Sequence, residues 1–243
     1  MGVTRGTARG VMLRGRWDLI VAEPRPRPFV TLTFASSLDG SIAAQPGRPL
    51  ALSGAESLRF THQLRAAHDA ILAGIGTVLA DDPQLNVRLA AGPNPRPVIL
   101  DSELRCPPRA RCLDAARQTI LAATHSAPLE RERALVAAGG CVWRLPSAGA
   151  DSSRIDLAPL LERLASEGIR TLMVEGGARV ITSFLRARLV DRVILTLAPT
   201  FIGGVRGVVD LVSETGAFPR LRNMSIERAG QDLIVSGDLD WSP

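Results

Sequence analysis

Thr171-Leu172-Met173-Val174-Glu175-Gly176-Gly177 contains the transition that decides the fold. The four residues before Glu175 are apolar or β-branched, which favours a buried strand. The two glycines predict a tight turn, and residues 178–187 have the composition of a helix. A buried strand that passes through a glycine turn into a helix is typical of a parallel sheet built from βαβ units.

The same alternation recurs on both sides of this unit. Apolar runs predict strands at 29–35, 70–73, 97–100, 119–123 and 193–197. Helical patterns follow at 53–67, 77–81, 129–138 and 157–167, and Ser53 with Glu56 predicts a capping box for the first of them. Residues 225–228 and 232–239 predict paired strands at the end of the chain. We therefore expect an α/β fold with a mostly parallel central sheet, helices on both faces and antiparallel C-terminal strands.

The bulk composition predicts an ordinary globular enzyme-sized domain. Of 243 residues, 46% are hydrophobic and 22% charged. We expect one domain over residues 29–243, preceded by a loose, basic and proline-rich segment over residues 1–28. No apolar run reaches the ~18 residues of a membrane span and no signal peptide is evident, so we expect a cytoplasmic protein without membrane contact.

The charge distribution argues against a nucleic-acid partner. The net charge is +5, and because the chain has no lysine its basic residues are all arginines. These arginines are mixed with acids after Asp18, and aromatic residues are only 4% of the chain. Scattered arginines indicate a composition bias rather than a phosphate-binding surface.

The cysteines and histidines do not predict a metal site. Cys106, Cys112 and Cys141 form no Cys-x-x-Cys pair, and no histidine lies at zinc-ligand spacing. We expect no metal.

Polar and small residues gather where the predicted parallel strands end, which is where such sheets bind ligands. The positions are Glu175-Gly176-Gly177, Gly74-Ile75-Gly76-Thr77, Asp101-Ser102 and Thr124. Glycines allow close backbone approach, and a helix N-terminus after them favours phosphate, so the set predicts a dinucleotide laid across the strand ends. The alternative is that the glycines only supply positive φ in tight turns. Neither Gly-x-Gly-x-x-Gly nor Walker A is present, which disfavours a plain Rossmann domain.

Two further patterns have a functional and a structural interpretation. Arg65 and Arg88 flank the Gly76-Thr77 turn and could bind a phosphate, or could be ordinary surface arginines. Asp81-Asp82 could supply a proton donor, because a neighbouring like charge raises a carboxyl pKa, or could only end a helix before Pro83.

Several stretches of the chain together resemble a known family, the reductase of riboflavin biosynthesis, both stand-alone and as the C-terminal half of the bacterial deaminase-reductase. The resemblance runs from about Phe29 to near the C-terminus. It rests on residues 37–40, 64–66, 74–88, 96–102, 174–177, 189–192 and 198–204, of which Gly74-Ile75-Gly76-Thr77-Val78-Leu79-Ala80-Asp81-Asp82-Pro83 is the most specific.

The resemblance implies a dihydrofolate-reductase-like fold, a homodimer and NADPH as the cofactor. It implies that hydride passes to C1′ of the ribosylamino group of a pyrimidine 5′-phosphate, through a ring-opened imine, to give the ribitylamino form. By position it implies cofactor contacts from Ala35, Thr77, Asp81, Ser102, Gly176, Gly177, Ala178, Arg179, Val180, Ile181, Thr182 and Ser183. It implies substrate contacts from Arg65, Leu85, Arg88 and Glu175, with both arginines on the phosphate, and catalytic roles for Asp81 and Glu175.

Departures from the family leave alternatives open. Bacterial members carry lysine at the position of Thr33, and serine and tryptophan at those of Pro49 and Ala51. The zinc motif of the deaminase half is absent, so only reduction is expected. The first alternative is a related NADPH reductase acting on dihydrofolate, another pterin or a secondary-metabolite pyrimidine. The second is a non-catalytic nucleotide-binding protein. The sequence does not distinguish an amino from an oxo group at C2 of the pyrimidine.

Overall fold

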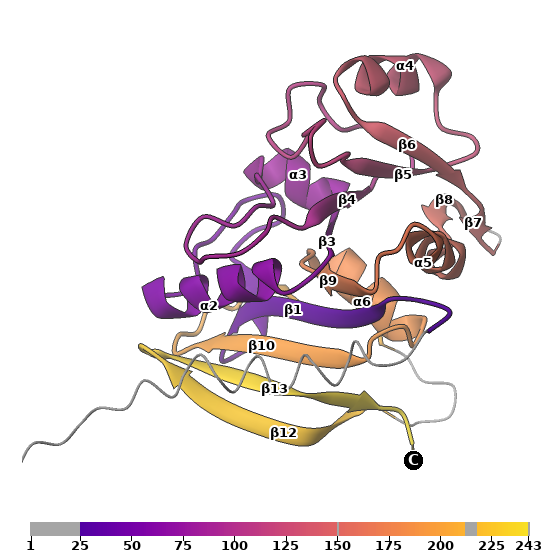
Figure 1. Cartoon of the computed structure of the whole chain (residues 1–243). Helices are drawn as coiled ribbons and strands as arrows, with labels where there is room; N and C mark the ends of the chain where they lie inside the picture. Colours follow the sequence, from indigo (N-terminus) through magenta and orange to yellow (C-terminus); the bar gives the residue numbers. More distant parts are fainter. Residues whose placement is uncertain (1–24, 150, 212–217, 243) are drawn as a thin grey trace, which may run out of the picture.

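The computed structural model describes residues 25–149, 151–211 and 218–242, and a long sheet runs through them (Figure 1). Its strands are β1 (Phe29–Ser37), β3 (Ala70–Gly74), β4 (Arg96–Leu100), β5 (Ile120–Thr124), β6 (Cys141–Leu145), β9 (Thr171–Val174), β10 (Arg192–Ala198), β12 (Arg220–Ala229) and β13 (Asp232–Asp240). Two small pairs lie outside it, β2 (Ser41–Ala43) with β11 (Val205–Arg206), and β7 (Ser147–Ala148) with β8 (Asp151–Ile155). The helices are α2 (Ala55–Ala66), α3 (Ile75–Asp81), α4 (Leu129–Ala137), α5 (Leu157–Ser166) and α6 (Ala178–Arg186).

The strand order in the large sheet is β12-β13-β10-β1-β9-β3-β4-β5-β6. All neighbours from β10 to β6 pair in parallel, whereas β13 pairs antiparallel with β10 and with β12. The expected parallel sheet with antiparallel C-terminal strands is therefore confirmed. The prediction missed β6, in which the charged residue Arg144 interrupts the apolar run.

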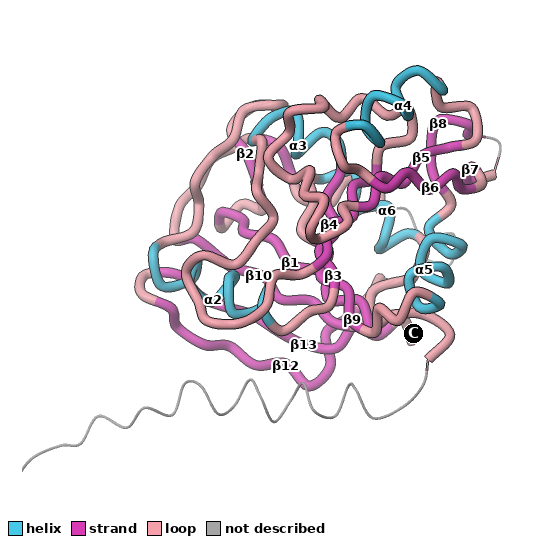
Figure 2. Tube along the Cα trace, turned by 45° about the horizontal axis from the view of Figure 1, so that its top comes forward, coloured by secondary structure: helices cyan, strands magenta, loops and turns pink. Residues whose placement is uncertain are grey.

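Helices cover both faces of the sheet, as expected (Figures 1 and 2). Successive residues of a strand point to opposite faces, so Leu72 and Ile71 of β3 enter different cores. Leu72 packs in a core with the apolar residues of α5 and α6. Ile71 packs in a second core to which α2, α3 and α4 contribute Leu64, Val78 and Leu135. Because both faces are covered, the middle strands are apolar throughout, which explains their continuous hydrophobic runs.

The predicted capping box of α2 is wrong. The N-cap is Gly54, and no side chain within the helix caps it. The cap comes from β13 instead, where the buried Asp232 carboxylate accepts hydrogen bonds from Gly54 N at 2.8 Å and from the Ser57 hydroxyl. A carboxylate distant in sequence has replaced the local cap, which no short-range pattern can predict.

The predicted loose segment 1–28 lies mostly outside the described residues. Its last residues are attached to the domain, because Arg25 and Arg27 pair with Asp191 at 2.9 and 2.6 Å. No helix in the described part of the chain has both the length and the apolar character needed to cross a membrane.

Candidate active site

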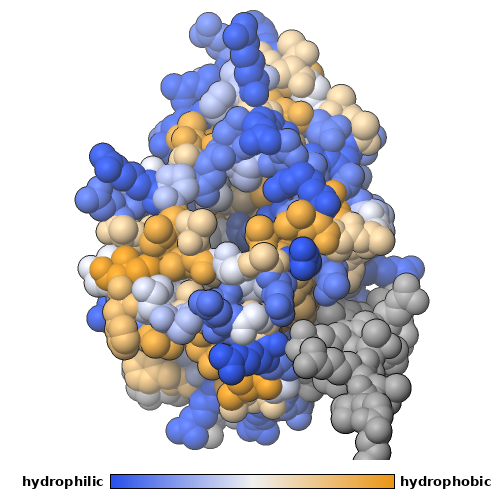
Figure 3. All heavy atoms as spheres, turned by 90° about the vertical axis from the view of Figure 1, so that its left-hand side faces the viewer, coloured by the Kyte–Doolittle hydropathy of each residue, from blue (hydrophilic) through white to orange (hydrophobic). Residues whose placement is uncertain are grey.

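The polar strand ends predicted from the sequence lie side by side. Strands β9, β3, β4 and β5 are consecutive in the sheet, so Glu175, Gly74, Ser102 and Thr124 come to one edge. Thr124, at the end of β5, is bonded to the chain that follows β4, because its N and Oγ1 donate to Ser102 O at 3.1 and 2.9 Å. Figure 3 views the molecule from the side on which β1 and β10 end, and it shows a hollow near the middle of that face.

The glycines of the 175–177 turn do not supply positive φ, so that alternative is excluded. A Cβ on Gly176 would lie 2.7 Å from Val180 Cβ, and one on Gly74 would lie 2.6 Å from Val180 Cγ2. These two glycines therefore let α6 pack closely on the ends of β9 and β3. Gly177 differs, because a Cβ there would meet only Thr77 Oγ1, at 3.6 Å. The space in front of Gly177 is thus open and bordered by the Thr77 hydroxyl.

The first turn of α6 holds free main-chain donors. Val180 N and Ile181 N donate to Gly177 O at 3.0 and 3.1 Å. The N–H groups of Ala178 and Arg179 have no hydrogen-bond partner within the described residues. Free N–H groups at the positive end of a helix favour an anion such as a phosphate. This turn is the part of the predicted cofactor stretch that is best suited to a ligand.

The rest of the predicted stretch is engaged in packing. The side chains of Val180 and Ile181 are buried in the core under α6. Thr182 Oγ1 accepts from Val209 N at 3.2 Å, and Ser183 Oγ accepts from Arg154 Nη2 at 3.0 Å. These side chains fix the helix whose N-terminus follows the open space at Gly177.

Arg65 and Glu175 meet at the end of β9. Arg65 Nε and Nη2 donate to Glu175 Oε2 and Oε1 at 2.9 and 2.6 Å, and Arg65 Nη1 donates to Asn86 O at 3.1 Å. Arg65 is only 8% exposed, whereas Glu175 is half-buried. All three guanidinium nitrogens of Arg65 are engaged, which makes it a fixed positive charge rather than a free one.

The loop after α3 carries the other predicted substrate residues. Leu85 has φ 48° and is 2% exposed, so its side chain anchors the loop. Arg88 is exposed, and its Nη1 donates to the side-chain oxygens of Asn86 and Gln84. Desolvation and then the positive charge of Arg65 lower the pKa of Arg88, so the two arginines lie close enough to repel. An anion bound between them would relieve that repulsion.

His62 belongs to this cluster and was missed in the sequence. It is fully buried, and its Nδ1 accepts the main-chain N–H of Arg88 at 3.0 Å. Burial, and then the charges of Arg65 and Arg88, lower the pKa of His62, which keeps the ring neutral. The available signal was its place three residues before Arg65 on one helix, since such residues share a face.

The two adjacent carboxylates predicted as an acid pair have separate roles. Asp82 ends α3 in the left-handed region, with φ 40°, and its Oδ1 accepts Arg111 N at 2.8 Å. The carboxylate of Asp81 has no hydrogen bond or ion pair within the described residues, and desolvation raises the pKa of Asp81. Asp81 alone is therefore suited to proton transfer.

Two further residues border the ends of β1 and β10. Ala35 lies in β1 opposite Thr196 of β10. Asp39 was not expected to have a role of its own, but its side chain joins the turn after β1 to the loop after β10. Its carboxylate accepts from the Ser37 and Ser41 hydroxyls, both at 2.6 Å, and from Ile202 N and Gly203 N at 2.9 and 2.8 Å. These hydrogen bonds hold the pKa of Asp39 well below its usual range.

The described residues contain no group of three or more His, Cys, Asp or Glu side chains arranged for a metal.

Comparison with known proteins places this arrangement in a family. The model of the RibD C-terminal domain matches residues 28–235. The 2,5-diamino-6-ribosylamino-4(3H)-pyrimidinone 5′-phosphate reductase of Methanothermobacter thermautotrophicus is 42% identical over 221 residues, covering 86% of this chain and 97% of that protein. The structure of Saccharomyces cerevisiae riboflavin biosynthesis reductase Rib7 has a TM-score of 0.72 at 31% identity, covering 92% and 95% of the two chains. Acinetobacter baumannii RibD has a TM-score of 0.74 at 26% identity, covering 88% of this chain and 59% of that one. This chain belongs to the family of the RibD C-terminal domain.

Proposed function

We propose that the chain reduces 2,5-diamino-6-ribosylamino-4(3H)-pyrimidinone 5′-phosphate to its ribitylamino form with NADPH. The observation that carries the proposal is the position of Glu175. Its carboxylate is paired with Arg65 on one side, and the two glycines after it lead into the free N-terminus of α6 on the other. A substrate held by the arginine cluster and a cofactor held by α6 would meet at this residue.

The residues present fit a dinucleotide cofactor. The open space at Gly177, the Thr77 hydroxyl and the free N–H groups of Ala178 and Arg179 form a cradle for a diphosphate. Ser102, two strands along the same edge, extends it. NADPH, when bound, supplies the hydride for the reduction. The task of the protein is to hold the two ligands in line and to exclude water from between them.

The substrate side is built from the arginine cluster. Arg88 has an exposed guanidinium and is the residue that would contact the 5′-phosphate directly. Arg65 would add a fixed charge behind it. The side chain of Leu85 is buried, so a contact from this residue to the substrate would come through its main chain. Glu175 would accept hydrogen bonds from pyrimidine N–H groups or sugar hydroxyls. Asp81, with its raised pKa, would provide the proton that accompanies hydride transfer.

The 2-amino form of the pyrimidine is favoured over the 2-oxo form. The stand-alone relatives from Methanothermobacter thermautotrophicus and Archaeoglobus fulgidus are both named for the 2,5-diamino compound, and this chain covers 97% of each. The homodimer implied by the resemblance remains a prediction, which sedimentation of the purified chain would test.

The test is NADPH oxidation by the purified chain with both pyrimidine phosphates and with dihydrofolate. We expect turnover with the 2-amino compound and a higher kcat/KM than for the 2-oxo compound. Turnover of dihydrofolate alone would support the related-reductase alternative. NADPH binding without turnover of any of the three would support the non-catalytic one.

A further inference from the structure

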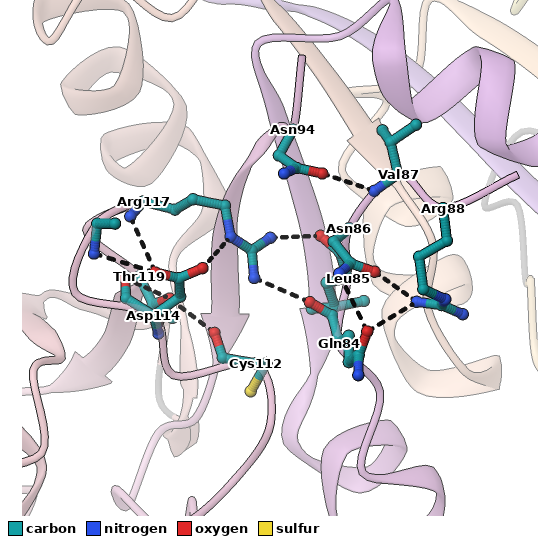
Figure 4. A network of polar contacts seen from close by, with 11 residues as sticks. Gln84, Leu85, Asn86, Val87, Arg88, Asn94, Cys112, Asp114, Arg117 and Thr119 are labelled. Carbon is teal, nitrogen blue, oxygen red and sulfur yellow. Dashed lines mark hydrogen bonds and ion pairs between the residues drawn. The ribbon is translucent and has the colours of Figure 1, made fainter. Parts of the chain in front are cut away.

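Arg117, which lies in the connection between β4 and β5, holds the loop that carries Arg88 (Figure 4). Its Nη1 donates to Leu85 O at 2.7 Å, and its Nη2 donates to Gln84 O at 3.0 Å. One guanidinium thus holds two consecutive carbonyls of residues 84–88. Arg117 lies 32 positions from Leu85 in sequence and comes to it only through the fold.

The rest of this loop is held in the same way, so each of its residues has a main-chain polar group bound by a side chain from elsewhere. Three further contacts complete the set: Arg65 Nη1 to Asn86 O at 3.1 Å, Val87 N to Asn94 Oδ1 at 2.7 Å, and Arg88 N to His62 Nδ1 at 3.0 Å. Main-chain groups outside regular secondary structure pair with other main-chain groups, with side chains or with water. Here side chains of the protein hold the main chain of every residue from 84 to 88.

The side chain of Arg117 is itself held in place by a second residue, Asp114. Its Nε donates to Asp114 Oδ2 at 2.6 Å, and its side chain is only 12% exposed. Asp114 is oriented in turn, because its Oδ1 accepts Ala116 N at 3.0 Å and its own N donates to Thr119 Oγ1 at 3.0 Å. Thr119 Oγ1 donates to Cys112 O at 2.7 Å. The guanidinium is therefore held in one orientation, with two forked donors aimed at the loop.

The loop needs this support because its backbone is strained. Leu85 has a φ of 48°, a left-handed conformation that a residue with a branched side chain adopts only when its surroundings impose it. The Leu85 side chain is buried, which provides one anchor, and the carbonyl held by Arg117 provides the second. Loss of Arg117 would remove the second anchor, so the strained backbone would be free to relax and to displace Arg88.

We propose that Arg117 is a positioning residue for phosphate recognition, acting on the substrate only through the backbone of residues 84–88. The proposal rests on the proposed function, in which Arg88 contacts the 5′-phosphate. It assigns to the connection between β4 and β5 a role in substrate selection as well as the cofactor contact predicted for Ser102.

The test compares Arg117→Gln with Arg96→Gln as a matched control. Arg96 also donates to a carbonyl of the same connection, Gln118 O, at 3.0 Å, but it begins β4 at the opposite end of the strand from Ser102. Both variants are assayed with the 2-amino pyrimidine 5′-phosphate and with its dephosphorylated nucleoside. We expect Arg117→Gln to raise KM for the phosphorylated compound by about 10- to 100-fold, or about 1.4–2.7 kcal/mol. Activity toward the nucleoside and NADPH affinity should stay near the wild-type values, and Arg96→Gln should leave the preference for phosphate intact.

Arg117→Lys tests whether the loop needs the forked hydrogen bonds of the guanidinium or only its positive charge. A lysine keeps the charge but cannot hold two carbonyls and the Asp114 carboxylate in one plane. We expect its KM to fall between those of the wild type and Arg117→Gln. A wild-type KM in Arg117→Lys would contradict the forked contact.

Hydrogen exchange of the purified chain gives a readout that does not depend on activity. We expect faster exchange at the amides of Val87 and Arg88 in Arg117→Gln, and unchanged exchange there in Arg96→Gln. If the wild type reduces neither compound, the proposed function fails, while the exchange result still decides whether Arg117 positions the loop. Unchanged exchange, or an equal loss of activity with the phosphate and the nucleoside, would overturn the inference.

Discussion

The guanidinium of Arg65 and the carboxylate of Glu175 form a forked ion pair, with Nε–Oε2 and Nη2–Oε1 distances of 2.9 and 2.6 Å. The pair joins α2 to the end of β9 across 110 positions of sequence. Arg65 is buried, so removal of its partner would leave a desolvated charge. The pair therefore fixes both the charge behind the proposed phosphate site and the carboxylate between the two proposed ligands.

Glu175→Gln should reduce turnover and leave NADPH affinity unchanged. The amide keeps the shape of the side chain but loses the charge that pairs with Arg65, at a cost of about 1–3 kcal/mol in the free energy of unfolding. NADPH titration by fluorescence, turnover and urea unfolding measure the three effects. Loss of NADPH binding in this variant would mean that Glu175 serves the cofactor, not the substrate.

Arg88→Ala and Arg65→Ala should both raise KM for the phosphorylated substrate, but only one should destabilise the fold. Arg88 is exposed, so its loss should change the free energy of unfolding by no more than about 0.5 kcal/mol. Its KM should rise by a factor that corresponds to about 1.5–3 kcal/mol, the value of a charge-assisted hydrogen bond. Arg65→Ala should in addition lower the free energy of unfolding by about 2 kcal/mol or more, because Glu175 and Asn86 O lose their partner. A normal KM in Arg88→Ala would remove that residue from the site.

Gly176→Ala should mainly lower the stability of the fold, whereas Gly177→Ala should mainly weaken NADPH binding. The methyl group at Gly176 would lie 2.7 Å from Val180 Cβ, so overpacking should lower the free energy of unfolding by about 1–3 kcal/mol. At Gly177 the nearest atom is Thr77 Oγ1 at 3.6 Å, so the fold has room for the methyl group. That methyl group would occupy the proposed phosphate space, and Kd for NADPH should rise about tenfold, or ~1.4 kcal/mol. Full NADPH affinity in Gly177→Ala would place the diphosphate elsewhere.

Stability should decrease in weak acid because of His68. Its Nδ1 donates to Leu64 O at 2.6 Å and its Nε2 accepts from the Thr31 hydroxyl at 2.9 Å, which fits a neutral ring. Burial lowers the pKa of His68 from 6.5 to about 4. Between these two values the unfolded chain binds a proton that the folded chain does not, so acid favours unfolding. The free energy of unfolding should fall by up to about 3 kcal/mol from pH 6.5 to 4. Urea unfolding across this range should give a smaller slope for His68→Gln; an unchanged slope would exclude His68 as the cause.

The cofactor preference should be NADPH over NADH by at least about tenfold in kcat/KM, or ~1.4 kcal/mol. The basis is the family resemblance. Steady-state kinetics with both cofactors at one substrate concentration measure it. Equal kcat/KM values would contradict the assignment.

The parts of this structure that the sequence predicts are those governed by local patterns. The apolar runs of β3, β4, β5 and β9 and the spacing of leucines in α5 are short-range signals, and each element lies where it was expected. The strand ends could be grouped because parallel topology brings carboxyl ends to one edge.

The parts that were missed depend on contacts between distant residues. The cap of α2 comes from Asp232, and the loop at residues 84–88 depends on Arg117 and His62. Nothing next to Leu85 in the sequence indicates that its carbonyl is held by Arg117, which lies 32 positions further along the chain, beyond β4. The resemblance pointed to Arg65 and Glu175 separately, but their pairing became visible only in the fold.

The most direct test of the central claim is transfer of label from deuterated NADPH. The chain is incubated with NADPH that carries deuterium at the transferable C4 position and with 2,5-diamino-6-ribosylamino-4(3H)-pyrimidinone 5′-phosphate, and the product is analysed by mass spectrometry and NMR. The account predicts a ribitylamino product with one deuterium at C1′. A product without deuterium, or with deuterium on the pyrimidine ring, would contradict it.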